Sequence, residues 1–164
     1  MAKHKFRVVQ GCPCPINIAP YIEIVTQDAK AMVNSIYRGA DAERLLNAHG
    51  HSSQRQLYTG WIERRPGYLP ANPPGFSTHE LRSDGVAYPS VPRSAELPWW
   101  CQGFDVNDAD VPHVKAAAAR YGWEVWQPYS SGSEVHHLNF RRQPRPTRRT
   151  AARIVRLRLT LPRH

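Results

Sequence analysis

The chain has 164 residues and a formal net charge of +9, from 22 Lys and Arg against 13 Asp and Glu. This length is typical of one domain with a real hydrophobic core. No apolar run reaches the roughly 18 residues of a membrane span, and three Cys are too few for a disulfide framework. A transmembrane protein and a small disulfide scaffold are therefore not expected.

Charge is unevenly distributed along the chain. Residues 141–164 contain nine Arg and no acidic residue, whereas residues 1–140 are formally neutral. We therefore expect a domain over residues 1–140 and a basic, Pro- and Arg-rich tail or linker over residues 141–164. The tail has three possible roles: a solvated end, an attraction to acidic polymers of a cell wall or membrane surface, or binding to nucleic acid phosphates. It has no aromatic residue for base stacking, so no specific nucleic acid is expected as a partner.

The predicted elements follow in chain order. The first half predicts a strand at residues 6–10, a helix capped by residues 26–28 that stops at Gly39, a helix from Asp41 to Gly50, and a helix capped by residues 52–54. The second half predicts an extended loop at residues 70–74 that leads to His79, a helix capped by residues 108–110, and antiparallel strands at residues 123–126 and 135–140. In the tail, alternating apolar and basic residues from Ile154 to Leu161 favour a strand or an amphipathic adhesive segment. This order predicts an α+β domain in which helices flank a small antiparallel sheet.

Three short motifs carry the candidate chemistry: Ser77-Thr78-His79, Gly103-Phe104-Asp105 and Glu134-Val135-His136-His137. Two His and one acid are a common ligand set for a catalytic zinc ion, which keeps one position open for water. A carboxylate outside the ligand set must then move the proton of that water. Each motif is weak alone in a chain with 8 His, and the order of the three motifs is the stronger signal.

That order resembles the zinc peptidases of bacterial cell walls that include D-alanyl-D-alanine carboxypeptidases and L-alanyl-D-glutamate endopeptidases. It is most similar to the peptidase domains of endolysins from phages of actinobacteria, and the likeness covers about residues 50–140. The resemblance implies a Hedgehog/DD-peptidase-like fold and one zinc ion held by His79, Asp105 and His137. It also implies that Glu134 is the catalytic base and that peptidoglycan is the substrate.

Two ligand positions have alternatives. The family has a short gap between the first His and the Asp, but 25 residues separate His79 from Asp105, and Asp84 is the nearer acid. We prefer Asp105, which lies in an apolar, strand-like run, whereas Asp84 lies in a Ser-Asp-Gly turn signal. His136 stands where the family usually has Trp, so it could replace His137. Neighbouring strand residues point to opposite faces, so one of the two is expected to face the metal.

The substrate side of the site is also suggested by the resemblance. The segment from Gly50 to Tyr58 resembles a family segment in which a polar side chain holds the substrate carbonyl, and Gln54 matches that side chain. Ser52 stands where the family has Arg, which favours an endopeptidase over a carboxypeptidase. The loop from Arg82 to Trp100 is expected beside the cleft, which Trp99, Trp100 and Trp126 could line if they are not core residues.

The N-terminus is basic, but its apolar stretch is too short for a signal peptide, so synthesis in a host cytoplasm is expected. The resemblance implies release to the cell wall as a phage lysin, and a monomer is favoured. Cys12, Cys14 and Cys101 are expected to be free thiols, with a three-thiolate metal site as the alternative. The competing functional class is a non-catalytic protein that binds cell wall or nucleic acid through the basic tail.

Overall fold

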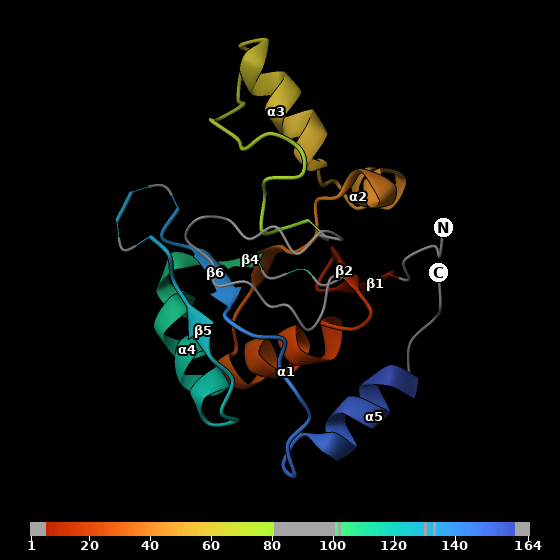
Figure 1. Ribbon diagram of the computed structural model, residues 1–164, viewed down its shortest axis with the longest axis vertical. Coiled ribbons are helices and arrows are strands. Elements are labelled where there is room, and N and C mark those ends of the chain that lie inside the picture. The colour runs from red at the N-terminus through yellow and green to blue at the C-terminus, as the bar shows by residue number, and fades with distance from the viewer. Residues whose placement is uncertain (1–5, 81–100, 102, 130, 133, 160–164) are drawn as a thin grey trace.

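The computed structural model describes residues 6–80, 101, 103–129, 131–132 and 134–159. Over these residues the chain is mixed α+β, with five α-helices and two small antiparallel sheets, as the sequence predicts (Figure 1). The helices are α1 (Ala19–Ala29), α2 (Glu43–Ala48), α3 (Gln54–Ile62), α4 (Val111–Ala119) and α5 (Ala151–Leu159). The strands are β1 (Phe6–Val9), β2 (Cys12–Pro15), β3 (Val33–Ser35), β4 (Gly103–Val106), β5 (Val125–Trp126) and β6 (His137–Phe140).

The four-stranded sheet determines where the candidate site lies. Its order is β3-β4-β6-β5, and every neighbouring pair is antiparallel. In the β4–β6 register, Phe104 lies opposite Leu138, and Asp105 lies opposite His137. Side chains alternate between the two faces of a strand. Phe104 and Leu138 therefore share the core face, while Asp105 and His137 share the other face.

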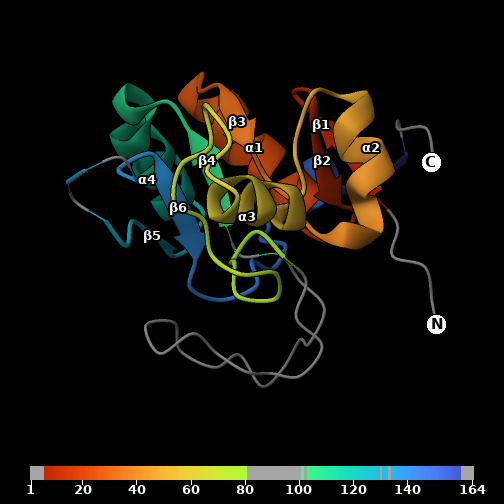
Figure 2. The same ribbon diagram turned by 90° about the horizontal axis from the view of Figure 1, so that it is seen from above.

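The core lies between this sheet and two helices. Helices α1 and α4 contact each other, and Ile22, Val25, Val114 and Phe104 are fully or almost fully buried among them. Helix α3 lies at the top of Figure 1, with α2 beside its lower end, and Figure 2 shows it from above. It begins at Ser53 with a capping box, in which the Ser53 hydroxyl accepts from the backbone N–H of Gln56. The helix predicted after residues 52–54 is thus confirmed.

Most other predicted elements are confirmed, and one helix is wrong. The strand at residues 6–10, the helices after Asp41 and after residues 108–110, and the antiparallel pair formed by β5 and β6 are all present. The helix predicted after residues 26–28 instead ends there, because α1 starts earlier with Pro20 in its first turn and stops at Lys30 in a left-handed conformation. The following residues, led by the β-branched Val33, form β3 against β4.

The tail is helical over Ala151–Leu159, where the sequence favoured a strand or an amphipathic adhesive segment. Helix α5 buries Ile154 and places Arg153 within 2.8 Å of the Asp28 carboxylate on α1. Residues 154–159 place Ile154 and Leu157 toward the protein and Val155 and Leu159 outward, which is a helical rather than an alternating pattern. The predicted boundary at residue 140 stays a prediction. Among the described residues, no helix is both long and apolar enough to cross a membrane.

Candidate metal centre

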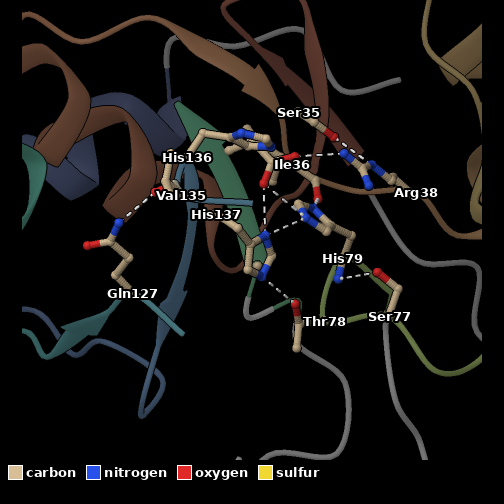
Figure 3. A network of polar contacts seen from close by, with 12 residues as sticks. Ser35, Ile36, Arg38, Ser77, Thr78, His79, Gln127, Val135, His136 and His137 are labelled. Atoms are coloured by element: carbon tan, nitrogen blue, oxygen red, sulfur yellow. Dashed lines mark hydrogen bonds and ion pairs between the residues drawn. The ribbon is translucent and has the colours of Figure 1, made fainter. Parts of the chain in front are cut away.

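Three segments that are distant in sequence bring His79, Asp105 and His137 together. His79 comes from the loop after α3, Asp105 from β4 and His137 from β6. The Nε2 atom of His79 lies 3.0 Å from Nδ1 of His137 and 3.2 Å from Oδ1 of Asp105, and His137 Nδ1 lies 2.8 Å from the same oxygen. All three residues are buried, and the two imidazole rings face each other in Figure 3. The three atoms thus form a nearly equilateral triangle.

The protein fixes which nitrogen of His79 faces this triangle. Its Nδ1 lies 2.6 Å from the carbonyl oxygen of Ile36, and a carbonyl can only accept, so Nδ1 carries the proton. Burial lowers the pKa of His79 to about 4, although the Asp105 carboxylate acts in the opposite direction. A neutral ring with its proton on Nδ1 presents a lone pair at Nε2. His79 therefore enters the triangle as an acceptor.

His137 is oriented by Thr78. The Thr78 hydroxyl lies 3.0 Å from Nε2 of His137. A hydroxyl can accept as well as donate, so it can support the tautomer with the proton on Nε2, which presents a lone pair at Nδ1. The packing requires a glycine at residue 103. A Cβ atom there would lie 2.6 Å from the Thr78 hydroxyl oxygen and 2.9 Å from Cε1 of His137. Gly103 thus leaves the space in which this hydrogen bond forms.

Asp105 is held by Arg38. One guanidinium nitrogen of Arg38 donates to the Asp105 Oδ2 atom at 2.6 Å, and its Nε donates to the Ser35 hydroxyl at 2.9 Å. Burial acts to raise the pKa of Asp105, but His79, the hydrogen bond with His137 and the Arg38 charge together hold it well below its usual range. The carboxylate is therefore ionised, and its Oδ1 atom is the oxygen that faces the two rings.

The donor set fits a metal ion. His79 Nε2 and Asp105 Oδ1 can both accept and lie 3.2 Å apart, and either a proton on His137 Nδ1 or a bound cation can join them. A ring nitrogen from each of two His and one carboxylate oxygen match the preferred ligands of zinc, and divalent ions of similar chemistry share them. Among the described residues, this is the group of potential ligands that converges closely enough to hold an ion.

The alternative ligands have different outcomes. His136 is turned toward Asp108, with its Nδ1 3.7 Å from the carboxylate, and it does not join the triangle. Asp84, Trp99 and Trp100 lie outside the described residues. The expectation that one of the two neighbouring His faces the ligand group is therefore met by His137.

A cavity of about 600 Å³ opens beside the triangle, and His79, His137, Glu134 and Gln54 are on its lining. Glu134 is exposed, and its backbone oxygen accepts a hydrogen bond from the His137 N–H at 3.0 Å. Gln54 is buried, and its Nε2 donates to the Asn72 carbonyl at 2.7 Å. Trp126 also lines the cavity. The roles of Glu134 and Gln54 stay predictions, but both have a place at the candidate site.

Sequence reasoning missed Arg38 and Thr78. The resembled family has an Arg at the position of Ser52. In this chain an Arg reaches the site from residue 38, between β3 and α2. Nothing local to residue 38 marks it, because its role depends on the pairing of β3 with β4. Thr78 does have a local signal, since it lies inside the Ser77-Thr78-His79 motif beside a candidate ligand.

The three Cys are free thiols, as predicted. All are buried, and burial raises the pKa of Cys12 to about 11 and those of Cys14 and Cys101 well above their usual value. Protonated thiols are poor metal ligands. Among the described residues, the three thiols also do not converge into a group that could hold an ion, so the three-thiolate alternative has no support.

Comparisons of the chain with protein-family models, with curated proteins and with solved structures find no match.

Proposed function

We propose that the protein is a zinc-dependent peptidase that cleaves a peptide bond in the stem or cross-link of bacterial peptidoglycan. The observation that carries this proposal is the buried triangle of His79, Asp105 and His137 at a cavity that Glu134 also lines. Its three residues are those that the motif resemblance implies as ligands, and that resemblance supplies the substrate class. A Hedgehog/DD-peptidase-like arrangement of the sheet belongs to the same proposal.

The residues have separate roles in this reaction. Zinc bound by the three side chains supplies Lewis-acid chemistry to water and to the scissile carbonyl. Glu134, exposed at the cavity, takes a proton from the attacking water and delivers it to the leaving amine. Thr78 keeps His137 in the tautomer that binds through Nδ1, and Arg38 keeps the Asp105 carboxylate ionised and oriented.

Endopeptidase action is favoured over removal of a terminal residue. A carboxypeptidase must bind a free terminal carboxylate, for which Arg is the usual partner. Arg38 is the Arg among the described lining residues, and its guanidinium already binds Asp105 and Ser35. The phage-lysin role and action at the cell wall after synthesis in a host cytoplasm complete the proposal.

The test is mass spectrometry of the products formed when the protein is incubated with purified peptidoglycan. One arm contains the protein as prepared, a second adds a chelator, and a third restores zinc after the chelator. We expect new amine ends in the first and third arms only. Glu134→Ala should lose turnover while it keeps its fold and its metal, and Glu124→Ala, an exposed acid outside the cavity, is the matched control.

The opposite result assigns the protein to the other functional class. If folded, metal-loaded protein releases no products in any arm, the hydrolase proposal fails for this substrate. Binding of peptidoglycan by Glu134→Ala at the level of the parent would then favour a non-catalytic wall-binding protein.

A further inference from the structure

The cavity at the metal centre has an aromatic part that the proposed reaction does not use. Its lining includes Trp61 from α3, Phe76 from the loop after α3, and Trp126 and Tyr129 from β5 and the segment after it. We call these four residues the aromatic arm. Trp61 is 38 % exposed, Tyr129 49 % and Phe76 57 %. Large apolar side chains left exposed around one cavity mark a binding surface.

One ring of the aromatic arm is held in place by a cation. The guanidinium carbon of Arg141 lies 5.6 Å from the centre of the Trp126 ring, within the range of a cation–π contact. A ring that is ordered before binding loses little conformational freedom when a ligand packs on it. Aromatic faces carry partial negative charge and attract the polarised C–H groups on one face of a saturated ring.

Two residues that line the same cavity each carry a buried acceptor. The Oε1 atom of Gln54 and the Oδ1 atom of Asn139 are buried without a hydrogen-bond partner among the described protein atoms. The orientation of the Gln54 amide is fixed, because its Nε2 donates to the Asn72 carbonyl, which can only accept. A buried acceptor without a partner costs about 1–3 kcal/mol. A ligand that brings O–H or N–H donors would remove that cost.

We propose that the aromatic arm binds an N-acetylated sugar ring of the glycan strand, next to the peptide at the metal centre. Such a sugar has an apolar C–H face for the aromatic rings and a rim of hydroxyl and amide donors for Gln54 and Asn139. A stem peptide alone supplies the donors but no rigid ring of this kind. This inference rests on the proposed function and names the part of the substrate that the enzyme recognises beyond the scissile bond.

The experiment compares two soluble substrates that share one stem peptide, with and without the disaccharide of N-acetylglucosamine and N-acetylmuramic acid. We expect kcat/KM of the native protein to be higher for the sugar-bearing substrate by up to about tenfold, the scale of one or two aromatic contacts. In Trp61→Ala the ratio of the two kcat/KM values should be close to one, because kcat/KM falls for the sugar-bearing substrate. Ile62→Ala is the matched control, because Ile62 is the next residue of α3, is 56 % exposed and lies outside the cavity lining.

A binding measurement separates this inference from the proposed function. The variant Glu134→Ala and the double variant Glu134→Ala, Trp61→Ala are each titrated with N,N′-diacetylchitobiose. The NMR signals of the Trp side chains report binding. Equal kcat/KM for the two substrates, or equal loss on both in Trp61→Ala, overturns the sugar site while leaving the peptidase proposal intact. Cleavage of neither substrate, combined with disaccharide binding that requires Trp61, overturns the peptidase proposal and leaves the sugar site standing. Absence of both cleavage and disaccharide binding overturns both.

Discussion

Two buried charged clusters among the described residues are built differently. In the first, Arg7 is 2 % exposed, forms an ion pair with Glu23 on α1, and donates to the Leu157 carbonyl on α5 at 3.1 Å. Each strong charge there meets an opposite charge or an acceptor. In the second, the atoms of His79, Asp105 and His137 that converge are all suited to accept.

The difference separates a structural role from a functional one. The Arg7 cluster pairs its charges within the protein and joins the tail helix to α1, although the Nε atom of Arg7 is buried without a hydrogen-bond partner among the described residues. The candidate metal centre differs, because Arg38 pairs with one oxygen of Asp105 while the other oxygen faces ring nitrogens of two His that can both accept. Burial alone therefore does not identify a functional cluster, whereas an excess of converging acceptors does.

The largest effect is expected from a variant that removes the cation of the first cluster. Arg7→Met removes the cation and leaves Glu23 and the Leu157 carbonyl without their partner, so the free energy of unfolding should fall by about 3–5 kcal/mol. Denaturant titration measures this loss. Metal affinity of the folded fraction should not change. The double variant Arg7→Met, Glu23→Leu should regain most of the stability, and a double variant as unstable as the single one would contradict the ion-pair account.

The next largest effect is expected from a variant that removes a candidate ligand from the second cluster. Asp105→Asn keeps the shape of the side chain but removes its charge, so zinc affinity should fall by more than about 100-fold, beyond the upper value for an outer-shell partner. Competition with a chromogenic chelator measures the affinity. Asp108→Asn is the control, because this carboxylate is 68 % exposed beside His136 and outside the triangle. Equal zinc affinity in the two variants would exclude Asp105 as a ligand.

The smallest effect is expected from a variant that changes a neighbour of the second cluster without removing a candidate ligand. Thr78→Val cannot accept the proton of His137 Nε2, so the tautomer that presents Nδ1 loses its support and zinc affinity should fall about 10–100-fold. Thr78→Ser retains the hydroxyl and should stay near the native value. The NMR shifts of the His137 ring nitrogens report the tautomer directly. Native affinity in Thr78→Val would show that Thr78 does not position this ring.

Local patterns explain which parts of the fold were predictable. Ser53 and Gln56 cap α3 within four residues, and Gly122 follows α4 in a left-handed conformation, so both helices could be placed from sequence. The residues from Ala29 to Ile36 have helical spacing, but α1 ends at Ala29 and Val33–Ser35 form β3, because pairing with β4 outweighs that spacing. The tail helix was missed because alternation over a few residues fits both element types.

The candidate site divides in the same way. The order of the motifs pointed to His79, Asp105 and His137. The apolar surroundings of Asp105 favoured it over Asp84. Arg38 could not be found, because its contact with Asp105 crosses 67 residues and exists only in the folded sheet. The orientation of Gln54 toward Asn72 is also set by tertiary contact.

The direct pairing of Asp105 with His137 has a consequence for the order of assembly. Both side chains lie opposite each other as soon as β4 and β6 have paired. His79 is tied to the same scaffold by its carbonyl, which accepts from the Arg38 N–H at 2.8 Å. Little chain entropy is left to lose when an ion arrives. If the triangle binds an ion, folding and metal binding can thus be separate events, and the folded chain can bind the ion afterwards.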